Sequence, residues 1–356
     1  MTLIIAEAGV NHNGNEELAF ALVDAAHKAG ADIVKFQTFK AKNLVTESAQ
    51  QAEYQVANTG IQESQFSMLK RLELSYEVHH QLVEYCNNLG IEFLSTAFDS
   101  ESLNFLVNDL GLKRLKLPSG ELTNAPLVLE HARTGCDLIV STGMATLAEI
   151  EAALGMIAFG YVNQEDSPTD EKVQAAYFSD EGKKLLKEKV IVLHCTTEYP
   201  APSEDINLNA MDTIANSFKL AVGYSDHSEG IIVPISAVAK GAVLIEKHFT
   251  LDKSLPGPDH KASLDPEELA SMVDGIRTVE KVLGDGIKGP RPTEIKNKVV
   301  ARKSLVAAKA ISVGESFTSN NLTIKRPGHG IEPSKYWSYL GKESSKGYEA
   351  GDLIDE

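Results

Sequence analysis

The feature that most limits how this chain can fold is an alternation of short apolar runs and amphipathic segments over its first 250 residues or so. Segments such as Glu16–Gly30, Leu147–Gly160 and Ile231–Gly241 carry helical periodicity, and several helical segments end at glycine, the expected residue after a helix. The runs read as strands, and they are Leu3–Ala6, Ile33–Phe36, Glu92–Ser95, Arg114–Leu117, Leu138–Ser141, Val190–His194, Leu220–Tyr224 and Val243–His248.

Eight strand-plus-helix units in about 250 residues predict an α/β fold of the (β/α)8 TIM-barrel type. A doubly wound open sheet is the alternative. A dinucleotide-binding fold is disfavoured because no Gly-x-Gly-x-x-Gly follows the first run. Two polar insertions, at about residues 40–65 and 161–188, read as loops or short extra helices.

The chain changes character after the barrel pattern. We expect a catalytic barrel over residues 1–284 and a linker over 285–298, which is rich in Gly, Pro and Lys. Residues 299–356 have short strand-like runs punctuated by Gly and Pro, which predicts a small β-rich domain. So small a domain has little stability from core size alone, so we expect it to dock on a partner surface.

Net charge and cysteine use restrict the partners. A formal net charge of −16 argues against nucleic acid and against an anionic membrane surface, although a small anionic substrate remains compatible with local cations. Three widely spaced cysteines suit a reducing compartment. Neither a signal peptide nor a membrane span is evident, so we expect a cytoplasmic protein.

Polar residues end every predicted strand, where a barrel places its active site. Lys35 and Lys116 lie in otherwise apolar strands and are predicted to bind phosphate and carboxylate groups. The alternative is that each lysine forms a structural ion pair with a neighbouring glutamate. Glu121, which follows the fourth strand, joins both lysines and Glu246 among the catalytic candidates.

Two histidines are candidate metal ligands. His227 and His248 end neighbouring strands, so their imidazoles can meet on one cation. Glu246 lies two residues before His248 and faces the same side, and Asp226 precedes His227. His12 and His194 are expected to be hydrogen-bonding site residues, and Cys195 an inert buried thiol.

Several segments in order resemble the sialic acid synthase family, and the likeness covers almost the whole chain. The tail LTIKRPGHGI is similar to the antifreeze-like (SAF) domain that follows the barrel in these enzymes. The barrel segments are AEAGVNHNG, VKFQTF, LSTAFD, LKLPSGELTN, STGMATLAEI, LHCTTEYPAP, VGYSDHSEG and IEKHFTLDKSLPGPDHKASLDP.

The resemblance implies a carbon–carbon bond-forming transferase of surface polysaccharide biosynthesis that condenses phosphoenolpyruvate with an N-acetylated amino sugar. It implies a divalent metal on His227 and His248, Mn²⁺ first, with Mg²⁺ and Co²⁺ as alternatives. Arg326 matches an arginine that one subunit inserts into its partner's barrel, which implies a domain-swapped homodimer. The implied substrate-binding residues are Ser119, Ser141 and Ser225 for phosphoenolpyruvate, and Asn13, Thr197, Tyr199, Asp226 and Arg326 for the sugar or its surroundings.

The sequence leaves more than one candidate for the sugar substrate. Our first expectation is an N-acetylneuraminate synthase that uses N-acetylmannosamine and cleaves the C–O bond of phosphoenolpyruvate. Asn13 and Thr197 stand where some such enzymes carry glutamate and asparagine, so an N,N'-diacetyllegionaminate or pseudaminate synthase acting on a 2,4-diacetamido-2,4,6-trideoxyhexose is the alternative. A metal-dependent sugar aldolase or isomerase and a non-catalytic sugar-binding homologue are the remaining rivals.

Overall fold

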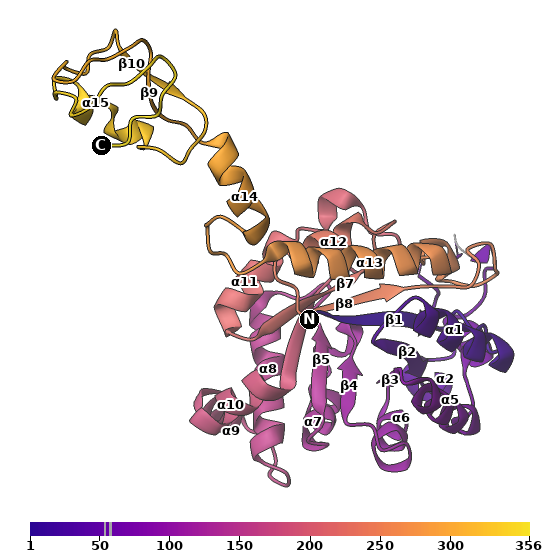
Figure 1. The fold of residues 1–356 in the computed structure, drawn as a ribbon. Coiled ribbons are helices and arrows are strands. Elements are labelled where there is room, and N and C mark those ends of the chain that lie inside the picture. Colours follow the sequence, from indigo (N-terminus) through magenta and orange to yellow (C-terminus); the bar gives the residue numbers. More distant parts are fainter. Residues whose placement is uncertain (53–54, 57–58) are drawn as a thin grey trace. The chain divides into compact units, whose positions relative to one another are not determined.

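The computed structural model describes residues 1–52, 55–56 and 59–356. These residues form two compact units, Met1–Gly284 and Asp285–Glu356 (Figure 1). No helix within the described ranges is both long and apolar enough to cross a membrane.

The first unit is a closed barrel of parallel strands, as predicted. Each strand pairs with the next along the chain, and β8 closes the ring by pairing with β1, with Leu3 beside Leu244. All the predicted strands are confirmed, with ends that shift by up to three residues. They are β1 (Leu3–Gly9), β2 (Ile33–Thr38), β3 (Glu92–Ala97), β4 (Arg114–Leu117), β5 (Asp137–Ser141), β6 (Val190–His194), β7 (Ala221–Asp226) and β8 (Leu244–His248).

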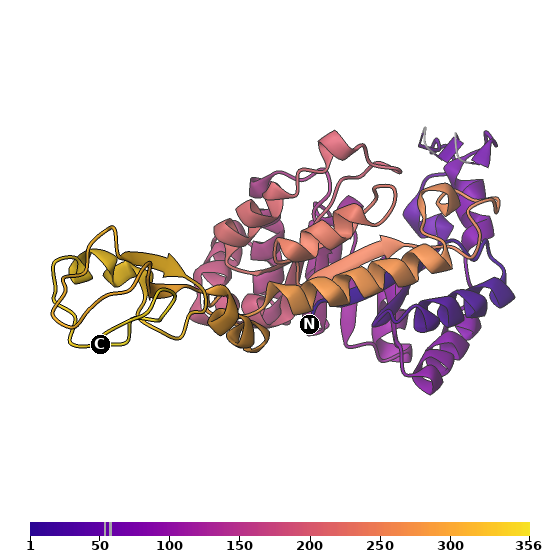
Figure 2. The ribbon, with the colours of Figure 1, turned by 45° about the horizontal axis from the view of Figure 1, so that its top comes forward.

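Helices surround this ring, and the long α13 lies along its outside (Figure 2). Local signals set their ends: the Asn15 side chain accepts the Leu18 N–H at the start of α1, and Gly90 ends α5 with a left-handed φ of 79°. The helices of this unit are α1 (Glu16–Lys28), α2 (Ala41–Leu44), α4 (Gln65–Leu72), α5 (Tyr76–Leu89), α6 (Ser100–Asn104), α7 (Ala125–Arg133), α8 (Leu147–Val162), α9 (Asp170–Phe178), α10 (Asp180–Lys189), α11 (Asn209–Phe218), α12 (Ile232–Ala239) and α13 (Pro266–Leu283).

The interior of the barrel is layered by strand alternation. A buried apolar layer consists of Ile5, Ile33, Leu94, Ile139, Leu193 and Leu244. Two residues further along the same strands come Glu7, Lys35, Thr96, Ser141, Cys195 and Glu246. Because side chains two apart on a strand share a face, the apolar layer closes the barrel below and a polar layer lies directly above it.

Both insertions contain helices. The first, residues 40–65, includes α2 and leads into α4, and residues 53–54 and 57–58 of it lie outside the described residues. The second, residues 161–188, includes α9 and most of α10. There Ala176 packs with Leu129 and Phe159 in a buried cluster, so α9 covers the outer side of α8.

The second unit has its own small core. Strands β9 (Ser304–Ala307) and β10 (Leu322–Lys325) pair antiparallel, so the β-rich tail is confirmed. The core contains Leu305, Phe317, Leu322 and Tyr348. Helix α14 (Pro292–Ala301) starts inside the stretch expected to be a linker, and α15 spans Tyr336–Tyr339.

Two buried histidines predict how the barrel responds to acid. Burial lowers the pKa of His79 and of His131 from 6.5 to about 4, so the folded chain keeps both neutral where the unfolded chain binds protons. The free energy of unfolding should therefore fall as pH drops from about 6.5 to about 4, by about 3 kcal/mol at most for each histidine.

Urea unfolding at about pH 7.5 and about pH 5 measures this effect. A His131→Leu variant should lose less stability between the two pH values than the wild type does. Replacing the exposed His27 should leave this loss of stability as it is in the wild type. An equal loss of stability in His131→Leu and in the wild type would contradict the conclusion that His131 stays neutral in the folded barrel.

Candidate active site

A cavity of about 340 Å³ opens at the carboxyl ends of the barrel strands. Most of the residues predicted for the site line it, from segments spread over the whole barrel. These are Lys35, Lys116, Ser119, Glu121, Ser141, Thr197, Tyr199, Ser225, His227, Glu246 and His248.

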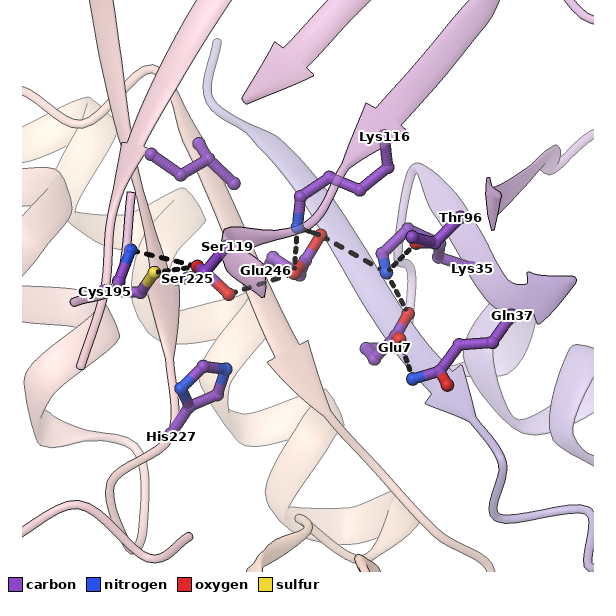
Figure 3. A network of polar contacts seen from close by, with 12 residues as sticks. Glu7, Lys35, Gln37, Thr96, Lys116, Ser119, Cys195, Ser225, His227 and Glu246 are labelled. Carbon is purple, nitrogen blue, oxygen red and sulfur yellow. Dashed lines mark hydrogen bonds and ion pairs between the residues drawn. The ribbon is translucent and has the colours of Figure 1, made fainter. Parts of the chain in front are cut away.

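Two buried lysines meet two buried glutamates in the floor of this cavity (Figure 3). Lys35 Nζ lies 2.8 Å from Glu7 Oε2 and 3.7 Å from Glu246 Oε2, and it donates to Thr96 Oγ1 at 3.0 Å. Lys116 Nζ donates to both carboxylate oxygens of Glu246, at 2.8 and 3.1 Å. Each lysine is thus ion-paired with glutamate, as the structural alternative held, and each also lines the cavity.

The two glutamates differ in their protonation. Burial raises the pKa of Glu7 to about 7, although Lys35 opposes that shift. Burial also acts to raise the pKa of Glu246, but Lys116 and Lys35 together outweigh it and hold that pKa below its usual value. The Ser225 hydroxyl adds a hydrogen bond of 2.9 Å to Glu246 Oε1. Glu246 is therefore held as an anion, whereas burial shifts Glu7 toward its protonated form.

His227 and His248 come together at the cavity wall with ring centroids 5.8 Å apart. His227 Nδ1 donates to the carbonyl of Thr196 at 2.6 Å, which orients the ring, and Tyr199 Oη lies 3.1 Å from its Nε2. Burial lowers the pKa of His227 to about 4 and is the main cause that lowers the pKa of His248 well below 6.5. Both imidazoles are therefore neutral, the form that binds metals.

These two residues fit a divalent metal that keeps open positions. His248 Nδ1 is buried and has no hydrogen-bond partner among the described residues, which is unusual for a buried polar atom. No cluster of three or more His, Cys, Asp or Glu side chains suited to a metal occurs in the described part of the chain. A metal held by these two imidazoles would have its other coordination positions open to water and substrate.

Small polar groups line the side of the cavity formed by β4, β5 and β6. The Ser119 hydroxyl accepts the N–H of Gly143 at 2.9 Å. A side chain at position 143 would collide with Ser119 Oγ and Thr197 Oγ1, so glycine is required there. The buried Ser141 hydroxyl has no partner within the described residues, so it is available to a ligand.

Three predicted substrate-binding residues do not line the cavity. Asp226 is fully buried and binds Lys247 at 2.6 Å, because Ser225 and His227 face inward and the residue between them must face outward. The Asn13 side chain is held by His260 Nε2, which lies 3.0 Å from Asn13 Nδ2. Arg326 belongs to the second unit, where its Nε donates to the carbonyl of Ala301 at 3.0 Å.

The two further histidines also lie off the cavity lining. His194 Nε2 contacts the carbonyl of Ile206 at 2.7 Å. His12 is fully buried, and its Nδ1 accepts the N–H of Gly14 at 3.0 Å. Cys195 is buried as expected, with its sulfur 3.3 Å from Ser119 Oγ.

Sequence reasoning missed several residues that line the cavity. Glu7, which is not among the predicted site residues, pairs with Lys35. Its place two residues beyond the inward-facing Ile5 could have identified it. Asp259, in the loop after β8, also lines the cavity, and burial raises its pKa to about 6. Nothing in its local sequence pattern predicts that position.

Comparison with known proteins shows which family the chain resembles. Residues 22–288 match the NeuB family, and residues 302–356 match the SAF domain. The chain is 48% identical over 355 residues to the N,N'-diacetyllegionaminic acid synthase of Campylobacter jejuni, an alignment that covers 100% of this chain and 99% of that protein. It is 47% identical to the protein of the same name from Legionella pneumophila, over 99% of this chain and 92% of that one.

The chain also resembles a solved structure over most of its length. The crystal structure of an N-acetylneuraminic acid synthetase from Leptospira borgpetersenii, in complex with citrate, matches with a TM-score of 0.65 and 32% identity. The match covers 83% of this chain and 90% of that one. With its barrel, its charged cavity and its SAF domain, this chain belongs to the NeuB family of sialic-acid-type (nonulosonic acid) synthases.

Proposed function

We propose that this enzyme is an N,N'-diacetyllegionaminate synthase. It condenses phosphoenolpyruvate with 2,4-diacetamido-2,4,6-trideoxymannose and water, and it releases phosphate. The observation that carries this proposal is the identity of 48% and 47%, over 99% or more of the chain, to two proteins that bear this name. It favours the diacetamido sugar over N-acetylmannosamine, our first expectation from the sequence.

The charged floor of the cavity supports binding of phosphoenolpyruvate. Lys35 and Lys116 hold the phosphate and carboxylate groups, and the hydroxyls of Ser119 and Ser141 donate hydrogen bonds to them. Ser225 would do the same once its hydroxyl turns from Glu246 to the substrate. This cationic site exists before the substrate binds, because both lysines already face the cavity from different strands. When the substrate binds, each lysine can replace a contact with glutamate by a contact with a substrate oxygen. Each ammonium group therefore stays paired throughout.

The reaction joins C3 of phosphoenolpyruvate to C1 of the open-chain sugar, adds water at C2 and releases phosphate by cleavage of the C–O bond. Glu246, an anion beside Lys116, orients the water, and the two lysines stabilise charge on the leaving phosphate. Glu121 lines the same cavity and receives a hydrogen bond of 2.7 Å from Asn124 Nδ2, which positions its carboxylate near the substrates.

His227 and His248 would hold the divalent metal, for which we propose Mn²⁺, with Mg²⁺ and Co²⁺ as alternatives. A metal bound there supplies Lewis-acid polarisation of the sugar aldehyde. Tyr199 and Thr197 line the cavity beside His227 and are proposed to contact the sugar.

We further propose that residues 1–284 are the catalytic domain, 285–298 the linker and 299–356 the SAF domain of a domain-swapped homodimer. Helix α14 carries three exposed apolar side chains, Ile295, Val299 and Val300, with 56%, 47% and 68% of their surface accessible. Such a patch is typical of a surface that another chain covers. Arg326 would then reach a partner's barrel.

Phosphate release tests the proposed reaction directly. Purified enzyme with Mn²⁺ and phosphoenolpyruvate should release phosphate with the diacetamido sugar at a kcat/KM about tenfold or more above that with N-acetylmannosamine. Mass spectrometry of the product should show the new nine-carbon acid.

Each rival gives a different result. A higher kcat/KM with N-acetylmannosamine would make the protein an N-acetylneuraminate synthase. An aldolase or isomerase would convert the sugar without phosphoenolpyruvate and without phosphate release. A sugar-binding homologue would bind without turnover.

A further inference from the structure

Seven apolar side chains gather on one side of the cavity, which Gln55 and Gln65 also line. Val10, Phe39, Met68 and Leu72 form a buried cluster of their own, and Leu44, Leu69 and Phe98 pack against it half-buried. Every one of these seven residues lines the cavity. We call them the apolar wall. It is built from the ends of β1, β2 and β3 and from helices α2 and α4.

Phosphoenolpyruvate does not explain this wall. Its phosphate and carboxylate need cations and donors, which the cavity floor supplies through Lys35 and Lys116. The apolar wall offers neither, since none of its residues carries a hydroxyl, an amide or a charge. A wall of this kind at the opening of a charged site fits a ligand with methyl groups.

The two candidate sugars differ in the groups that such a wall can distinguish. N-Acetylmannosamine carries hydroxyls at C4 and C6. The diacetamido-trideoxy sugar carries an acetamido group at C4, which ends in a methyl, and a methyl at C6. A hydroxyl pressed against the wall would lose its water without gaining a partner, whereas a methyl would gain burial.

We infer that the apolar wall is the element that sets sugar specificity, by receiving the C6 methyl and the methyl of the C4 acetamido group. This inference rests on the proposed function and identifies which residues choose between its two candidate sugars. One methyl or methylene in a hydrophobic pocket typically changes kcat/KM by roughly 10- to 200-fold.

Leu69 and Leu44 allow a test because both are half-buried, so a polar replacement need not unfold the barrel. Leu69→Gln and Leu44→Gln should each lower kcat/KM for the diacetamido sugar about tenfold or more. The same variants should change kcat/KM for N-acetylmannosamine by less than about threefold and leave the KM for phosphoenolpyruvate near its wild-type value, since the lysines are untouched.

Two control variants test whether the effect depends on polarity in the apolar wall. Leu69→Met keeps the position apolar and should keep the wild-type ratio between the sugars. Leu89→Gln puts the same polar group on a half-buried leucine of α5, which does not line the cavity, and should leave the ratio unchanged.

The outcomes separate this inference from the proposed function. A wild-type preference for the diacetamido sugar that survives in both glutamine variants would overturn the wall's role and leave the function standing. Equal losses on both sugars would mean that the wall only supports the fold, which also overturns the inference. A wild-type enzyme that turns over neither sugar with phosphoenolpyruvate would overturn the proposed function itself.

Discussion

Replacing His248 with alanine should lower kcat by about a thousandfold or more while the barrel stays folded. The side chain of His248 faces the cavity, so its loss removes one of the two imidazoles proposed to hold the metal. The strand itself is held by backbone pairing of β8 with β1 and β7, which the substitution does not touch. Thermal unfolding followed by circular dichroism should therefore remain close to that of the wild type.

Metal affinity provides a readout that is independent of turnover. Mn²⁺ titration of chelator-treated protein, followed by electron paramagnetic resonance, should show a large loss of affinity in His248→Ala. His80→Ala removes an exposed imidazole on α5 and should bind Mn²⁺ as the wild type does. Near-normal product formation by His248→Ala in chelator-treated buffer would remove the metal from the proposed reaction.

The barrel and most of its cavity could be predicted because both depend on local patterns. The repeat of strand and helix predicts the fold, and the carboxyl ends of parallel strands converge at one rim. Lys35, Lys116, His227 and His248 are polar residues at strand ends, and the structure brings all four to one cavity. No long-range information is needed for that inference.

Partnerships across the barrel could not be predicted in the same way. Lys116 and Glu246 are 130 residues apart, and their pairing depends on barrel closure and on side-chain length. The apolar wall was missed for another reason. Its α2 and α4 residues lie in or just after an insertion that was read as polar, and short helices carry little periodic signal. The prediction that Asp226 binds substrate was wrong. Side chains alternate along a strand, so a residue between the inward-facing Ser225 and His227 faces away from the cavity.

The pair formed by Asp226 and Lys247 predicts a large effect on stability. Both side chains are fully buried, and their strands are in register, so that Asp226 lies beside Lys247 on the outer face while Ser225 lies beside Glu246 on the inner face. Lys247→Met would leave the Asp226 carboxylate buried without its cation. We expect the free energy of unfolding to fall by about 3–5 kcal/mol, measured by urea denaturation.

A double variant separates the buried charge from the packing around it. In Asp226→Asn with Lys247→Met no charge remains, and the asparagine oxygen can still accept the N–H and hydroxyl of Ser228, as Asp226 does at 3.1 and 2.7 Å. The double variant should therefore recover at least half of the loss. Lys240→Met breaks an exposed ion pair with Asp212 and should cost less than about 1 kcal/mol. If Lys247→Met costs no more than Lys240→Met, the buried pair does not hold the ends of β7 and β8 together, and the positions of His227 and His248 must depend on other contacts.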